Sequence, residues 1–166
     1  MFDKDNTLTL PYSRTPHPSI SQPLTHCLDL FGRKNVAIVS NSVGSKDDHG
    51  YKEAILLESA LGISVIRHQH KKPDVSLEIQ QHFNLSLDQA WRVAMIGDRT
   101  MSDTIMGNQL GYFTIEVQPF DTARENRVVK AMRWVEGNVL PLIDGGKAPK
   151  HKILEGGKNV RDLVKG

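Results

Sequence analysis

The sequence predicts an α/β protein, a three-layer, Rossmann-like arrangement in which a parallel β-sheet carries helices on both faces. Three observations predict this fold. Short apolar runs alternate with amphipathic segments up to residue 117, an order that favours parallel strands joined by helices. The runs are continuously apolar, as in strands that are buried on both faces. Polar side chains follow the runs, at the strand ends where open α/β folds collect their reactive groups.

The composition is that of a globular protein. The chain has 166 residues, of which 39% are hydrophobic and 24% charged, which is enough for one buried core. No apolar run approaches the ~20 residues of a membrane span. The single cysteine, Cys27, excludes a framework of internal disulfides and is expected to be a small buried side chain. We expect one domain over residues 1–143 and a loosely ordered, basic tail over residues 144–166.

The chain opens on two carboxylates, Asp3 and Asp5, which follow an apolar residue and precede Asn6 and Thr7. Residues i and i+2 of an extended segment project to the same side, so both carboxylates are expected to face one substrate. Our hypothesis is that Asp3 attacks phosphorus and Asp5 handles the proton; a solvated acidic turn is the alternative. Because only two residues precede Asp3, we expect the first strand to be truncated, together with any targeting signal.

The next elements are predicted from apolar spacing and from the residues that end them. Three prolines make residues 10–20 an irregular loop. Helical spacing predicts a helix over 21–31, which Gly32 ends. Residues 35–40 form a predicted buried strand that delivers Ser40 and Asn41 to its carboxyl end, although a plain transition from strand to loop is equally typical of this pattern.

A second helix is predicted over 50–61 and a short strand over 63–66. His68 and His70 follow, but two histidines without a third ligand make a poor metal site, so we expect them to face solvent or substrate. Lys72 precedes Pro73, which restrains the backbone of the lysine. This restraint favours a fixed positive charge at that point.

The last predicted elements surround a second pair of carboxylates. Asp98 and Asp103 follow the predicted strand 92–96. The remaining predictions are helices over 74–83, 104–110 and 121–136 and a strand over 112–117.

The four groups of polar residues, in this order, resemble the four motifs of the haloacid dehalogenase superfamily. They are Asp-Lys-Asp-Asn-Thr, an apolar strand that ends in Ser, Lys-Pro, and Gly-Asp followed by a further Asp. The resemblance implies that Asp3 is the nucleophile and Asp5 the general acid and base. It also implies phosphate binding by Ser40, Asn41 and Lys72, and a Mg²⁺ ion held by Asp3, the Asp5 backbone carbonyl and Asp98, with Asp103 acting through water or as an orienting residue.

The gaps between these motifs leave no room for a cap domain. About 26 residues separate Thr9 from Val36 and about 29 separate Asn41 from Lys71, which predicts a capless core with an open site and a large substrate. Among capless members, the motifs resemble the mitochondrial phosphatidylglycerophosphate phosphatase family of fungi and plants. The resemblance implies an anionic phospholipid substrate at the matrix face of the mitochondrial inner membrane, on the route to cardiolipin, and it implies no nucleic-acid partner.

Two features at the mouth of the predicted site have more than one interpretation. Head-group contacts are expected from Arg14, His17, His70 and Arg99. The basic helix over 121–136, with Arg124, Arg127, Lys130, Arg133 and Trp134, either lies on anionic lipid or is the last helix of the fold, which buries Val128, Ala131 and Val135.

Two other functions fit the same motifs. One is a capless phosphatase for a soluble phosphomonoester, which would be indifferent to bilayers. The other is a non-catalytic phospho-accepting module, because receiver domains also place aspartates at the ends of parallel strands.

Overall fold

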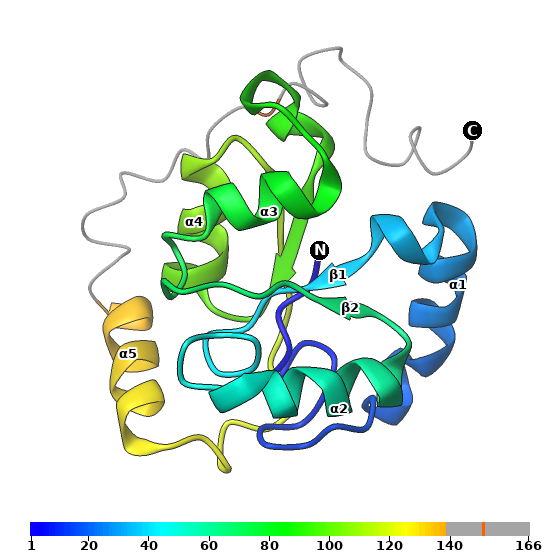
Figure 1. The fold of residues 1–166 in the computed structure, drawn as a ribbon. Coiled ribbons are helices and arrows are strands. Elements are labelled where there is room, and N and C mark those ends of the chain that lie inside the picture. The colour runs from blue at the N-terminus through cyan, green and yellow to red at the C-terminus, as the bar shows by residue number, and fades with distance from the viewer. Residues whose placement is uncertain (139–150, 152–166) are drawn as a thin grey trace.

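The computed structural model of the chain describes residues 1–138 and residue 151. Helices and short strands alternate along it, as Figure 1 shows, so the predicted order of elements and the α/β class are confirmed. The expected tail over 144–166 lies, apart from residue 151, outside the described residues. The elements are α1 Ser21–Phe31, β1 Ala37–Ile38, α2 Lys52–Leu61, β2 Ser64–Val65, α3 Ser76–Phe83, β3 Ala94–Gly97, α4 Ile105–Gln109, β4 Phe113–Glu116 and α5 Arg127–Asn138.

The strands form two small parallel sheets that the start of the chain joins. β1 pairs with β2 and β3 pairs with β4, both in parallel. Phe2 makes a parallel bridge to Ile38 of β1 and another to Ile96 of β3. Its neighbour Asp3 donates its backbone N–H to the Ile96 carbonyl at 2.8 Å. The first residues therefore lie between β1 and β3, with the carboxyl ends of the flanking strands on either side of Asp3.

Successive residues of β1 pack into two separate apolar clusters. Ile38 belongs to a cluster that includes Leu24 of α1 and Leu57 of α2. Its neighbour Ala37 belongs to the other cluster, which includes Ile79 of α3. Alternate side chains of a strand point to opposite faces, so the helices cover the strands from two sides. Figure 1 shows α3 and α4 together on one side, away from α1 and α2.

The polar loops begin where these strands end. α1 has the predicted bounds, and Gly32 ends it with φ of 78°, a conformation that glycine adopts without strain. The segments between the motifs contain α1 in the first gap and α2 with β2 in the second. Cys27 is half-buried against the cluster of α1 and α2. Among the described residues, no helix has both the length and the apolar content that crossing a membrane requires.

The prediction for the last helix was wrong in two respects. α5 begins at Arg127, six residues later than expected, and residues 121–126 form a loop. Val128 is 68% exposed and Ala131 is also exposed, so neither packs inside as predicted. Val135 is half-buried, as are Val129 and Met132. The helix is rotated relative to the prediction because charged side chains of α5 take up inward positions, as described below.

Candidate active site

Three aspartates from two distant parts of the chain meet in the structure. Asp3 follows the bridge at Phe2, Asp98 follows β3, and Asp103 lies in the helical turn 100–104 before α4. Each offers a carboxylate oxygen, and these oxygens lie within 4.8 Å of one another. All three residues are buried. Three buried carboxylates at this separation repel one another unless cations lie between them.

Lys72 supplies one such cation. Its Nζ donates to Asp3 Oδ1 at 2.5 Å and to Asp103 Oδ1 at 2.6 Å, and its side chain is 2% exposed. Burial lowers the pKa of Lys72, but the charges of Asp103 and Asp3 outweigh this effect, so the pKa is raised. The lysine is therefore a permanent positive charge inside the cluster.

The cations near the buried carboxylates do not fully offset the cost of burying their negative charge. Burial, with the charge of Asp3, raises the pKa of Asp98 to about 7. Burial also raises the pKa of Asp103 to about 6, although Lys72 opposes this change. Carboxylate oxygens are ligands for hard cations such as Mg²⁺, and a divalent ion would remove the repulsion that these shifts record. The donor set fits a divalent metal.

The predicted phosphate-binding residues frame Lys72. Asn41 accepts the Lys72 backbone N–H at its Oδ1 at 2.7 Å, so it links the loop after β1 to the lysine. Ser40 is buried, and its Oγ lies 3.2 Å from Ser42 Oγ and 3.4 Å from the backbone nitrogen of Val43. Both residues come from the carboxyl end of β1, as predicted. Asn41 therefore links the second and third motifs, whereas the Ser40 side chain holds the loop after β1.

Asp5 lies apart from the three clustered aspartates. Its Oδ1 accepts from Lys4 Nζ at 2.5 Å and from the Tyr12 backbone N–H at 3.1 Å. The loop that carries it is closed by Asn6, whose N–H donates to the Thr9 carbonyl at 2.7 Å. The chain bends at Lys4, between the two aspartates, so the extended backbone expected from Asp3 to Asp5 is interrupted there.

The residues expected at the mouth of the site have varied surroundings. Arg14 forms an exposed ion pair with Glu53 of α2 at 2.7 Å. His17 stacks on Phe120 with 4.1 Å between ring centroids. Arg99 Nη2 lies 3.3 Å from Met132 Sδ on α5. His70 is exposed.

The expectation that both histidines face solvent or substrate was wrong for His68. This residue is 1% exposed, and its ring bonds to the Ser40 and His70 carbonyls. It is a structural side chain that ties the loop after β2 to the loop after β1.

Arg133 and Glu125 are the site residues that sequence reasoning missed. Arg133 Nη2 donates to Asp98 Oδ2, and the guanidinium also bonds to both carboxylate oxygens of Glu125, at 2.7 Å or less for the closest pairs. Burial lowers the pKa of Arg133, but the bonds to Glu125 and Asp98 outweigh it and raise the pKa. The basic spacing of α5 had suggested an exposed face, and nothing local distinguishes Arg133 from Arg127 or Lys130.

A groove at the other ends of the strands is a poor alternative site. It is lined by residues that include Met1, Cys27, Phe31 and Arg92, near the amino ends of β1 and β3. It has no cluster of carboxylates. The candidate site is therefore the one at the carboxyl ends, with the aspartates.

Comparison with known proteins places this geometry in a family. The family model described as mitochondrial PGP phosphatase matches residues 1–119, where PGP is phosphatidylglycerophosphate. The chain belongs to the mitochondrial PGP phosphatase family. The match includes every residue that was predicted to be catalytic, phosphate-binding or metal-binding.

Relatives of the chain occur in a plant, an alga and yeasts. It is 37% identical over 158 residues to a chloroplastic/mitochondrial phosphatidylglycerophosphate phosphatase 1 of Arabidopsis thaliana, covering 93% of this chain and 44% of the relative. The chloroplastic protein of Chlamydomonas reinhardtii is 41% identical over 138 residues, 82% of this chain and 50% of the relative. A mitochondrial phosphatidylglycerophosphatase of Saccharomyces cerevisiae is 34% identical over 120 residues, 71% of this chain and 65% of the relative. No solved structure matches the chain significantly.

The coverages show that the likeness includes only part of each relative. The chain spans about half the length of the first two relatives. The loop with Glu125 and the helix with Arg133 both follow residue 119, where the match to the PGP phosphatase model ends. The contact between Arg133 and Asp98 therefore joins the family's matched region to a segment beyond it.

Proposed function

We propose that the chain is the catalytic part of a Mg²⁺-dependent phosphatase that converts phosphatidylglycerophosphate to phosphatidylglycerol on the route to cardiolipin. The proposal rests on the buried meeting of Asp3, Lys72, Asp98 and Asp103 in a chain of this family. The names of the relatives support the substrate. The fold we assign is a capless, three-layer haloacid dehalogenase-type core in a single domain over residues 1–143.

Asp3 is the nucleophile in this proposal. A carboxylate oxygen of Asp3 attacks phosphorus, the bond from phosphorus to the glycerol oxygen breaks, and an aspartyl-phosphate forms. Approach of a carboxylate to a phosphate dianion meets repulsion of about 4 kcal/mol per charge pair at 4 Å and an effective dielectric of 20. Lys72, which already contacts Asp3, offsets part of this repulsion, and Ser40 and Asn41 orient the phosphate.

Asp5 transfers the proton in both halves of the reaction. It protonates the leaving alkoxide and then removes a proton from the water that attacks the aspartyl-phosphate, which releases phosphate and restores Asp3. For this role its carboxylate exchanges its contacts with Lys4 and Tyr12 for contacts with the substrate. A carboxylate that is only half-buried can make this exchange without unfolding the loop.

The cation is assigned to the three clustered aspartates. Asp3 and Asp98 would hold it directly, with the Asp5 backbone carbonyl, and Asp103 would act through water or orient the site. When bound, Mg²⁺ supplies the positive charge that a phosphate dianion and several carboxylates jointly require.

A membrane surface is the proposed place of action. The outer face of α5 supports this part, because Val128 and Trp134 are 68% and 64% exposed and the exposed basic residues Arg127 and Lys130 lie close to them in the sequence. An apolar stripe with basic neighbours is typical of helices that lie on anionic lipid. We assign the chain to the matrix side of the mitochondrial inner membrane, with head-group contacts from Arg14, His17, His70 and Arg99.

The test is phosphate release from phosphatidylglycerophosphate in mixed micelles with Mg²⁺, beside a soluble phosphomonoester. The parent chain is compared with Asp3→Asn and with Asp29→Asn, an exposed aspartate of α1. We expect release from the lipid, a loss of at least about 10³-fold in kcat for Asp3→Asn, and no change for Asp29→Asn.

Each other result selects a different function. Cleavage of the soluble substrate alone would retain the chemistry and overturn the lipid assignment, which leaves a capless phosphatase for a soluble phosphomonoester. Stable labelling of Asp3 without turnover would identify a non-catalytic phospho-accepting module. An active Asp3→Asn variant would contradict the assigned nucleophile.

A further inference from the structure

The side chain of Arg133 contacts both the side chain and the backbone of Asp98. Nη2 donates to Asp98 Oδ2, and Nη1 donates to the Asp98 carbonyl oxygen at 3.1 Å. The side chain of Arg133 is 18% exposed and that of Asp98 is 1% exposed. Two donors of one rigid guanidinium on two acceptors of one residue leave the Asp98 carboxylate little freedom to rotate.

The contact leaves the other carboxylate oxygen of Asp98 available. Asp98 Oδ1 meets Thr7 Oγ1 at 3.4 Å, a long contact compared with a normal hydrogen bond between oxygens. Oδ2 is occupied by Arg133. A cation among the three aspartates can therefore use Oδ1 while Arg133 keeps Oδ2.

Glu125 balances the charge of Arg133. Its side chain is 5% exposed, and Arg133 Nη2 donates to Glu125 Oε1 at 2.6 Å. Asn6 Nδ2 donates to the same Glu125 oxygen at 2.7 Å, and Asn6 Oδ1 accepts the Asp121 N–H at 2.9 Å. Because the guanidinium is paired with Glu125, its repulsion of a nearby cation is largely cancelled. Its hydrogen bonds to Asp98 remain.

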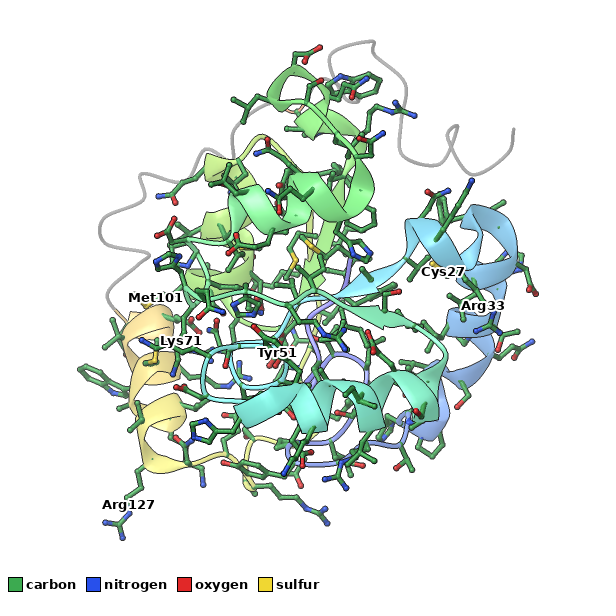
Figure 2. All side chains as sticks on the ribbon, viewed as in Figure 1. Cys27, Arg33, Tyr51, Lys71, Met101 and Arg127 are labelled. Atoms are coloured by element: carbon green, nitrogen blue, oxygen red, sulfur yellow. The ribbon has the colours of Figure 1, made fainter. Side chains whose placement is uncertain are left out.

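Two other side chains of α5 contact the segment that follows Asp98. The Met101 N–H donates to Glu136 Oε1 at 2.9 Å, and Arg99 contacts Met132. Figure 2 shows Met101 beside α5, and Arg127 extending from the other end of the helix away from the molecule. Of the three α5 side chains Met132, Arg133 and Glu136, it is Arg133 that donates to a carboxylate of the acidic cluster.

We propose that Arg133 is a positioning residue of the divalent-cation site, which holds Asp98 in the orientation that binds the ion. The inference rests on the proposed metal site and adds to it a residue outside the family match. Outer residues that orient a metal ligand typically contribute 10- to 100-fold to metal affinity. The segment 121–138 is thereby part of the cation site.

The experiment is calorimetric titration of the full chain with Mg²⁺ at pH 8. Arg133→Ala is expected to bind about 10- to 100-fold more weakly than the parent. Arg133→Lys keeps the charge but lacks the planar guanidinium that bonds to both Asp98 Oδ2 and the Asp98 carbonyl oxygen. Its affinity should fall between those of the parent and Arg133→Ala. Lys52→Ala, at an exposed basic position on α2, should bind as the parent does. Circular dichroism and thermal melting in EDTA establish that each variant is folded.

A further variant separates positioning from helix docking. Glu136→Gln weakens the contact with Met101 but leaves Arg133 on Asp98, so its loss of affinity should be smaller than that of Arg133→Ala. An equal loss would overturn the proposal, as would unchanged or tighter binding by Arg133→Ala. If Arg133→Ala does not fold, Arg133→Lys decides, and parent-like affinity in that variant would overturn the proposal. A parent chain that binds no Mg²⁺ would overturn the metal site itself and the role of Arg133 with it.

Discussion

Asp98 is a buried carboxyl group whose proposed role, binding a cation, requires its charged form. It lies at the end of β3, where burial and the charge of Asp3 raise its pKa to about 7, and the contact with Arg133 opposes this shift without cancelling it. A group whose pKa is higher in the folded than in the unfolded protein stabilises the fold below its unfolded pKa. That contribution is lost as the pH rises through the folded value.

This shift predicts how stability depends on pH without metal. In EDTA, the contribution of Asp98 to the free energy of unfolding should fall between about pH 5 and pH 7, by at most about 1.4 kcal/mol per pH unit. Asp98→Asn removes the titrating group and its interaction with the nearby Asp103 carboxylate, so the difference between parent and variant reports this contribution apart from that of His82. Urea unfolding at several pH values measures it. Parallel pH profiles for the two proteins would contradict the prediction.

At the scale of elements, the turn from β3 into α4 brings Asp98 and Asp103 close together because residue 97 has no side chain. A Cβ at Gly97 would lie 2.6 Å from Asp103 Cβ and closer still to Asp103 Oδ2. The strand and the helical turn 100–104 can therefore approach closely enough for Asp103 to reach Lys72.

Gly97→Ala should displace Asp103 and destabilise the protein. We expect a cost of about 1–3 kcal/mol in the free energy of unfolding, typical of overpacking, together with weaker Mg²⁺ binding. Gly137→Ala is the matched control, because a Cβ there meets nothing within 4 Å, and alanine in a helix gains up to about 1 kcal/mol. Unfolding and metal titration check both variants. Parent-like metal affinity in Gly97→Ala would show that the loop adapts without moving Asp103.

At the scale of the whole molecule, the first part of the chain is net negative and the last part is net positive. Residues 1–120 hold 11 Lys and Arg against 13 Asp and Glu, whereas residues 121–166 hold 10 against 6. The acidic cluster lies in the first part, and the exposed Val128 and Trp134 lie in the second. An anionic surface would therefore attract the second part and repel the first, which favours one orientation of the molecule on a membrane.

Sedimentation with vesicles tests this orientation. The chain should bind vesicles that contain an anionic lipid other than the substrate, and binding should weaken as salt is raised. Arg127→Ala should bind about fivefold more weakly, since a basic residue near such a surface contributes about 1 kcal/mol. Trp134→Ala should also lose affinity. Leu77→Ala removes a side chain on α3 that is 68% exposed and should bind as the parent does; an equal loss there would show that α5 has no special part.

The sequence by itself determined the class of fold and most of the polar groups at the strand ends. The order of apolar runs predicted the alternation of strands and helices, and the residues that follow those runs included Asp3, Lys72, Asp98 and Asp103, which the structure brings together. This succeeded because parallel strands deliver their carboxyl ends to one edge, so that local position along the chain predicts spatial proximity.

Tertiary structure alone decided which face of α5 is buried and which residues complete the site. Arg133 and Arg127 are both basic residues of one helix, but only Arg133 meets Asp98, which lies 35 residues earlier in the chain. His68 is buried, with its ring nitrogens beside the carbonyls of Ser40 and His70 in two different loops. Asp5 is not in the carboxylate cluster of Asp3, Asp98 and Asp103, and the chain bends at Lys4, between Asp3 and Asp5. These outcomes depend on partners that are distant in the sequence or on loop geometry, neither of which residue spacing encodes.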